Sequence, residues 1–262
     1  MPLPAAAKPV EKPVQASPLS KFGDAAPINK ISNTAEPIKK MEKSVSPPLF
    51  PRHLQLSFDV YKGINLSKVG LLRHQLDIDG DRYTLAADRQ AIGLSILANN
   101  EHLVQTSYGK VDEHGLWPDS FTEERIKEKK KQGLEATFDR KAQKLIYSNG
   151  SNTALPDDAQ DILSFMYQLS QLSMQREIIP LPITDGSQLE LSQIEVGVKE
   201  EISSPLGNLP VLHLRKMHEQ GQPYFEIWLG LEYRLFPVKF RQVDGMGQVT
   251  GEYVISDIRA ED

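Results

Sequence analysis

The chain contains no cysteine. Thiol nucleophiles, disulfide bonds and thiolate metal sites are therefore excluded as the basis of its chemistry. It also lacks any apolar run of about 18 residues, the length that a membrane-spanning helix requires, so we expect no membrane-spanning segment. The opening residues, Met1-Pro2-Leu3-Pro4, lack the basic and apolar regions of a signal peptide.

Signatures of catalysis and of nucleic-acid binding are missing as well. The sequence has no Gly-x-Ser-x-Gly, His-Glu-x-x-His or phosphate-cradling Gly-Lys-Ser motif. It has no arginine-rich stripe with interleaved aromatic residues, and its net charge is −5. We therefore expect a protein that is not an enzyme, with no cofactor, no metal site and no nucleic-acid partner.

Aromatic residues are scarce in the first part of the chain, where proline is abundant. Ten of the 18 prolines lie within the first 51 residues, and Phe22 is the only aromatic residue before Phe50. Residues 1–49 also hold seven lysines and four acidic residues. So little apolar material does not offset the entropy lost when a chain becomes ordered. We predict a disordered Pro/Lys-rich spacer over residues 1–49 and a single β-rich domain over residues 50–262.

Alternation of apolar and polar residues dominates that domain and predicts antiparallel β-strands. The clearest examples are the final three strands, over Tyr224–Gly230, Tyr233–Val243 and Glu252–Ile258. The remaining predicted strands are Leu54–Tyr61, Ile64–Asp79, Tyr83–Ala87, Ala91–Leu97, Leu103–Val111, Leu134–Phe138, Lys144–Ser148, Gln188–Leu191, Glu195–Ile202 and Val211–Met217.

Two segments between these strands differ in pattern. Gly115–Phe121 is predicted as a loop. Thr122–Gln132 fits either a charged helix or a charged edge strand, and we favour the strand because Ile126 is its only large apolar residue.

One main helix is predicted after Leu155. Pro156 suits a first helical turn, and Asp157 and Asp161 suit the positive end of the helix dipole. Apolar residues then recur at helical spacing as far as Leu172. The residues alone thus predict a mainly β fold with one main helix.

Several motifs in the domain resemble a known family. They are Gly-Leu-x-Pro-x-x-Phe at Gly115–Phe121, the run Leu155–Ser164, Glu226–Leu229 and Phe236–Lys239. Together they resemble the bacterial domain-of-unknown-function 3108 family, over about residues 54–258. The resemblance implies a half-barrel like that of lipoprotein carriers, in which a long curled antiparallel sheet wraps around one α-helix and leaves a hydrophobic concavity. It also implies a location on the periplasmic side of the bacterial envelope, and it implies no catalytic residues.

Six apolar residues are candidates for lining that concavity. They are Ile162, Leu163, Met166 and Leu169 in the predicted helix, with Trp228 and Phe240 in the sheet. The simpler interpretation of all six is a filled core. The functional interpretation is a cavity that binds a lipid or the acyl chain of a lipoprotein.

Two alternatives to ligand binding stay open. One is a protein–protein interaction module of the cell envelope, with an envelope protein partner docked on an exposed strand edge. The other, which we favour least, is a hydrolase that uses Asp157 and Asp161 as paired carboxylates. Aspartates at the start of a helix are more typical of capping.

The remaining polar candidates are predicted to be structural. Asp77–Asp81 is typical of a hairpin turn, because its glycine comes too early for a calcium loop. His213 and His218 lie five residues apart on a strand, hence on opposite faces, which disfavours a shared metal. His74 lies between Leu72 and Leu76 on an apolar face and is predicted as a core histidine.

Overall fold

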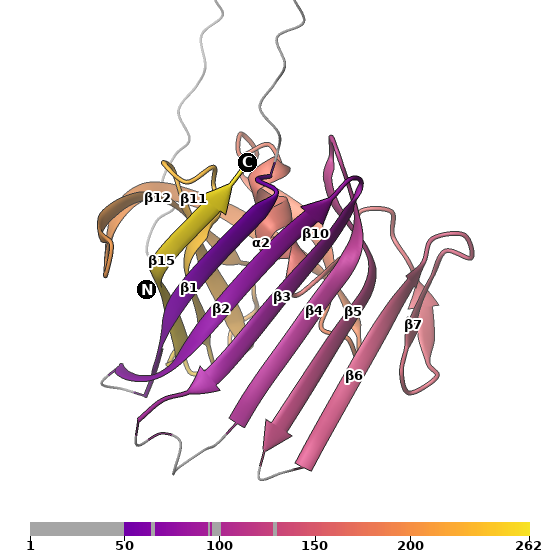
Figure 1. Cartoon of the computed structure of the whole chain (residues 1–262), viewed down its shortest axis with the longest axis horizontal. Coiled ribbons are helices and arrows are strands. Elements are labelled where there is room, and N and C mark those ends of the chain that lie inside the picture. The colour runs from indigo at the N-terminus through magenta and orange to yellow at the C-terminus, as the bar shows by residue number, and fades with distance from the viewer. Residues whose placement is uncertain (1–49, 64–65, 94, 96–100, 128–129) are drawn as a thin grey trace, which may run out of the picture. The chain divides into compact units, whose positions relative to one another are not determined.

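The computed structural model of the chain describes residues 50–63, 66–93, 95, 101–127 and 130–262 (Figure 1). The spacer predicted over residues 1–49 lies outside the described residues. The described residues are mainly β, as predicted, with fifteen strands hydrogen-bonded into one sheet. This sheet curls over a short helix, α2 (Ser164–Gln168), so that it has a concave inner face and a convex outer face (Figure 1).

The strands follow one another along the sheet in two runs. The first run is β1 (His53–Lys62), β2 (Ser67–Asp79), β3 (Arg82–Ala91), β4 (Glu101–Asp112), β5 (Gly115–Lys127), β6 (Lys130–Asp139), β7 (Lys144–Tyr147) and β8 (Asn152–Ala154). The second run is β9 (Gln160–Asp161), β10 (Ile178–Thr184), β11 (Leu189–Ser204), β12 (Gly207–Lys216), β13 (Tyr224–Gly230), β14 (Pro237–Val243) and β15 (Val249–Glu261).

The two runs meet where the first strand pairs with the last. β1 lies antiparallel to β2 on one side and to β15 on the other, with His53 opposite Glu261. Every neighbouring pair in the sheet is antiparallel except β9 and β10. The strand order therefore begins at β8, passes through the β1–β15 pair and ends at β9.

The predicted loop over Gly115–Phe121 is wrong, because this segment begins β5. Gly115 lies directly opposite Asp112 and has a φ of +112°, so it closes a tight turn into the strand. Pro118 is accommodated at a register shift between β4 and β5, where a missing ladder hydrogen bond does least harm. The charged segment that follows is strand in its described part, as we favoured, and residues 128–129 lie outside the described residues.

Three further strand boundaries differ from prediction. Ala91 ends β3 and Gly93 lies in a turn, so the described part of Ala91–Leu97 forms no new strand. The two strands predicted between Gln188 and Ile202 are one continuous strand, β11. The strand predicted from Tyr233 starts only at Pro237, because Arg234 and Leu235 adopt positive φ angles of 52° and 57° in a turn.

The predicted helix is much shorter than its apolar spacing indicated. Only α2 and a following 3₁₀ turn, η1 (Leu169–Gln171), are helical, whereas Gln160 and Asp161 form β9 beside β10. Every residue of α2 is buried. A helix that packs against the core on all sides does not need a single apolar stripe. The apolar spacing in the sequence therefore gave the wrong ends for this helix.

Buried polar bonds hold α2 against the inner face. The Tyr167 hydroxyl lies 3.0 Å from Nδ1 of His74, in the middle of β2. Gln168 accepts a hydrogen bond from the Leu116 amide at 2.7 Å and donates one to the His114 carbonyl at 2.8 Å. His74 is 2% exposed, which confirms the predicted core histidine, although its partner is a hydroxyl on the helix.

We expect His74 to make the fold sensitive to acid. Burial lowers the pKa of His74 from 6.5 to about 3. Between these values the unfolded chain binds a proton that the folded protein does not. The stabilisation is therefore complete above pH 6.5 and is lost as the pH falls towards 3. At ~1.4 kcal/mol per pKa unit, the loss should amount to about 3–5 kcal/mol.

Urea unfolding at neutral and progressively lower pH would measure this effect. The His74→Leu variant should have a lower free energy of unfolding at neutral pH but a flatter dependence on pH. The same substitution at the exposed His218, which forms no ion pair among the described residues, is the control and should not flatten the slope. An equal slope in His74→Leu and the wild type would contradict the assignment.

Candidate functional site

A row of aromatic rings crosses the inner face beside α2. The Phe240 ring stacks on Tyr253 with centroids 4.3 Å apart and meets Phe58 edge-on at 5.4 Å. It also stacks at 6.1 Å on His74, the partner of Tyr167 in α2. These rings form a continuous apolar floor from the helix to the ends of β1 and β15.

Charged side chains continue the inner face beyond this floor. The Arg89 guanidinium donates hydrogen bonds to the Tyr253 hydroxyl at 3.2 Å and to the Glu101 carboxylate at 3.0 Å. Glu101 also pairs with Arg125 at 3.1 Å, and Arg125 reaches Glu123 at 2.9 Å. Alternation along β3 puts Arg89 on the same face as the buried Tyr83, Leu85 and Ala87, so this ion-pair group faces the concavity.

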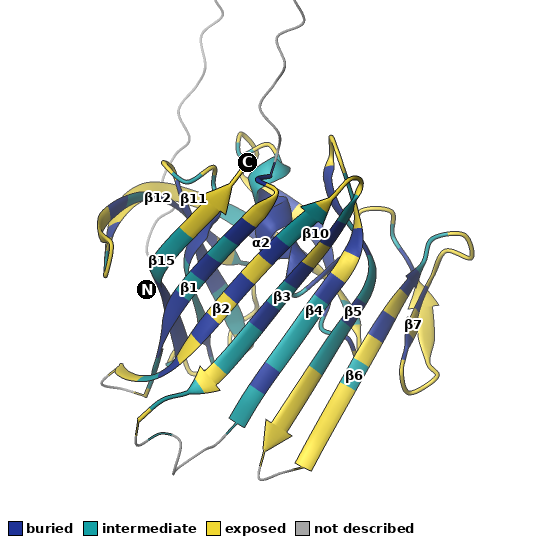
Figure 2. Cartoon of the chain, in the orientation of Figure 1, coloured by how far each residue is buried: buried dark blue, intermediate teal, exposed yellow. Residues whose placement is uncertain are grey.

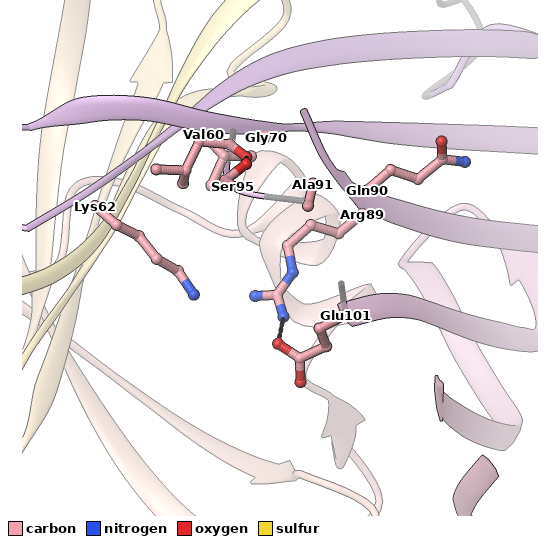
Figure 3. Close-up of a pocket in the computed structure, with 9 residues that line it drawn as sticks. Val60, Lys62, Gly70, Arg89, Gln90, Ala91, Ser95 and Glu101 are labelled. Atoms are coloured by element: carbon pink, nitrogen blue, oxygen red, sulfur yellow. Dashed lines mark hydrogen bonds and ion pairs between the residues drawn. The ribbon is translucent and has the colours of Figure 1, made fainter. Parts of the chain in front are cut away.

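A pocket of about 200 Å³ lies at the junction of floor and charges, and we call it the inner pocket. Its lining combines the apolar groups of Val60, Val69, Gly70 and Ala91 with the polar and charged groups of Lys62, Arg89, Gln90, Ser95 and Glu101. Figure 3 shows the side chains of Lys62, Arg89 and Glu101 extending into one space. Ligand pockets usually measure ~300–1,000 Å³, so this one suits a headgroup with a few methylenes rather than a whole lipid.

Lys62 is the least compensated charge in the inner pocket. Burial and the neighbouring cation Arg89 lower its pKa, while Glu101 acts in the opposite direction. Among the described residues its ammonium group forms no ion pair, whereas Arg89 and Arg125 each pair with Glu101. A partly buried ammonium beside guanidinium groups gains free energy when an anion approaches it.

Five of the six predicted ligand residues lie on the inner side of the sheet. Leu163, Met166 and Leu169 are 1%, 7% and 0% exposed and belong to the hydrophobic core. Ile162 and Phe240 are partly buried and pack against that core. Phe240 lies nearest to the inner pocket, since it stacks on the tyrosine that bonds Arg89. A ligand contact for these residues stays a prediction.

The sixth residue, Trp228, lies on the outer face, because its neighbour Ile227 is opposite the inward-facing Phe240. Its ring stacks on His213 at 4.6 Å and is flanked by the cations of Lys239 and Arg241 at 4.8 and 5.1 Å. Burial opposes ionisation of the adjacent Glu226, yet the His213 ring, whose Nε2 lies 3.3 Å from the carboxylate, and the hydrogen-bonded Arg241 outweigh it and lower the Glu226 pKa to about 2. This group packs the outer face, and a ligand contact for Trp228 also stays a prediction.

The paired-carboxylate hypothesis places its two aspartates in unlike surroundings. Asp157 is exposed, whereas Asp161 is fully buried. Asp161 accepts hydrogen bonds from the amides of Leu163 and Ser164 at 2.9 and 2.8 Å and from the Ser107 hydroxyl at 2.5 Å. Burial raises its pKa, although these bonds oppose the rise. The geometry is that of a carboxylate tying the start of α2 to β4.

Comparison with known proteins supplies a family. The family model described as "Protein of unknown function (DUF3108)" matches residues 57–254. The chain belongs to the DUF3108 family. Among curated proteins, none matches this sequence.

The solved structures similar to this DUF3108 chain have low sequence identity to it. A β-barrel-like protein of domain of unknown function DUF1849 from Brucella abortus aligns with a TM-score of 0.54 and 10% identity, covering 82% of this chain and all of the other. A lipoprotein candidate from Parabacteroides distasonis aligns with a TM-score of 0.34 and 9% identity, over 80% of this chain and 98% of its own. The first alignment establishes a shared fold, and we draw nothing from the second.

Two of the segments that carry the DUF3108 resemblance meet beside α2. The Gln160 side chain donates a hydrogen bond to the Leu116 carbonyl at 2.8 Å, and the Leu116 amide bonds to Gln168. Any side chain at Gly115 would collide with Gln168. These motif residues therefore fix the short helix to β5.

The inner pocket was missed at the sequence level. Its signal was present in β3, where Arg89 continues the inward-facing positions of Tyr83, Leu85 and Ala87. A charged residue at such a position marks the point where a buried face becomes solvated. In the described parts of this DUF3108 chain no group of three histidine or acidic residues could hold a metal ion. None of the helices in the described ranges has the length and apolar character needed to cross a bilayer.

We expect Asp161→Ala to destabilise the DUF3108 domain by about 2–4 kcal/mol, because it leaves buried donors on Leu163, Ser164 and Ser107 without their acceptor. Asp157→Ala is the matched control, and its effect should stay within about 0.5 kcal/mol because Asp157 is exposed. Thermal and urea unfolding would measure both. Equal effects of the two substitutions would contradict the structural role of Asp161.

Proposed function

We propose that this protein is a non-enzymatic ligand-binding domain that takes an acyl-bearing ligand on the inner face of its half-barrel. The observation that carries the proposal is the inner pocket, where Val60, Val69 and Ala91 adjoin charged side chains at the end of an aromatic floor. Ligand sites typically combine apolar walls with a few polar groups in this way. A lipid or a lipoprotein acyl chain is the class of ligand that such a surface suits.

The binding mechanism is burial of methylene groups against the apolar lining of the inner pocket, because Phe58, His74 and Tyr253 of the aromatic floor are already buried and only Phe240 is partly accessible. Each sequestered CH₂ stabilises the complex by roughly 0.8 kcal/mol. The space between α2 and the sheet is occupied by core residues such as Leu163 and Leu169. The ligand would therefore enter on the part of the inner face away from α2. There the last residues of β5 and the first residues of β6 are exposed (Figure 2).

We also propose that the domain acts on the periplasmic side of the bacterial envelope. The support is the family resemblance, which implies an envelope protein. Fractionation of cells that produce the protein from its natural gene would test the location. Recovery in the cytoplasmic fraction would contradict it.

The test of ligand binding compares the same substitution on the two faces of β3. Ala91→Trp fills the inner pocket, whereas Ala86→Trp adds the same side chain on the outer face. The full-length chain should co-purify with an acyl-bearing molecule that native mass spectrometry detects and solvent extraction identifies. We expect Ala91→Trp to lose this molecule and Ala86→Trp to keep it. Retention in a folded Ala91→Trp variant would refute the site.

A protein-interaction module remains the second candidate function. Among the described strands β8 ends the sheet, and all three of its residues are exposed, so its outer edge is available to an added strand. Leu191 and Val198 of β11 are also 64% and 66% exposed. If no preparation of the folded protein carries or binds an acyl ligand, this candidate becomes the leading one, and crosslinking in the envelope would identify the partner.

A further inference from the structure

The inner pocket also carries information about the polar end of its ligand. Three cationic side chains (Lys62, Arg89 and Arg125) gather around two carboxylates (Glu101 and Glu123). Glu101 forms ion pairs with both arginines, so its negative charge is already compensated by them. The described residues here thus carry one positive charge in excess, although the chain as a whole has a net charge of −5.

The excess charge is located on Lys62. The Arg89 side chain is 17% exposed, and its guanidinium is held by Tyr253 and Glu101, so it has a fixed direction. Lys62 shares the pocket with it, and the two cations repel each other across a partly buried space. Such repulsion disfavours the empty site and favours a bound anion.

Apolar walls adjoin the cations in the same small space. Val60 and Ala91 line the inner pocket together with Lys62 and Arg89. An ion alone would leave these walls uncovered, and a neutral hydrocarbon would leave the cations without compensation. A molecule that joins the two chemistries satisfies both.

We propose that the inner pocket selects anionic amphiphiles, binding a carboxylate or phosphate headgroup between Lys62 and Arg89 while the adjoining hydrocarbon lies on Val60 and Ala91. This inference rests on the proposed function and names the class of its ligand. The headgroup accepts hydrogen bonds from the ammonium of Lys62 and from the guanidinium nitrogens of Arg89. The acyl chain then runs from the inner pocket towards Phe240, the ring of the aromatic floor that is only partly buried.

The experiment compares ligands that share one chain and differ in their headgroup. The full-length protein, stripped of any co-purified lipid, is titrated by calorimetry with dodecanoate, dodecyl phosphate and dodecanol below their aggregation concentrations. We expect both anions to bind about tenfold or more tightly than the alcohol, with an advantage that shrinks as salt is added. Lys62→Gln should remove most of this advantage of the two anions over dodecanol.

Lys68→Gln is the matched control variant. It removes the same charge from the neighbouring strand, where Lys68 pairs with Asp59 away from the inner pocket. We expect this variant to bind the anions as the wild type does. An equal loss in both variants would assign the effect to overall charge and would overturn the inference.

Failure of the inference can be told apart from failure of the proposed function. Equal affinity for dodecanoate and dodecanol, both abolished by Ala91→Trp, would overturn headgroup selection while ligand binding stands. Binding of none of the three would overturn both. If inorganic phosphate binds as tightly as dodecyl phosphate, the pocket recognises the anion alone. That result would overturn the proposal that its ligand is an amphiphile.

Discussion

The structure depends on the buried polar bonds that hold a five-residue helix inside a curled sheet. A helix as short as α2 has little stability of its own, because nucleation fixes several residues for few hydrogen bonds. Asp161 bonds to β4, Tyr167 to β2, and Gln168 to β5 and the turn before it, so the start and the end of the helix are both held. The helix in turn supplies the core on which the inner face of the sheet is buried.

That arrangement divides the inner face into two zones. Near α2 the concavity is filled by side chains such as Leu163 and Leu169. Farther along β3 to β5 the same face becomes polar, with Arg89 and Glu101 replacing aliphatic residues. The row from Tyr167 through His74 and Phe240 to Tyr253 connects the zones, so the anchor of the helix and the orientation of Arg89 belong to one packed unit.

The positions of most strands were readily predicted from the sequence. Which residues of distant strands come together in space was not. Alternation located most strands and the core histidine, because a face that packs on a core has a simple period. It missed β5, whose proline sits at a register shift that no local pattern reveals. Alternation also places Trp228 and Phe240 on opposite faces of the sheet, although both were candidates for lining the same cavity. The inner pocket escaped prediction because Lys62, Arg89 and Glu101 come from three different strands, β1, β3 and β4, which only the pairing of the sheet brings together.

The pairing of β1 with β15 has a consequence for how the fold is reached. Leu54 and Ala260 are neighbours in the sheet although 206 positions separate them in the chain. Each run of strands can form through contacts between consecutive strands, but the seam between the runs must wait for the end of the chain. Such distant contacts slow folding. Until β15 arrives, β1 offers an unpaired, largely apolar edge to any other strand nearby. The interval before the seam closes is therefore when the chain is most exposed to misassembly.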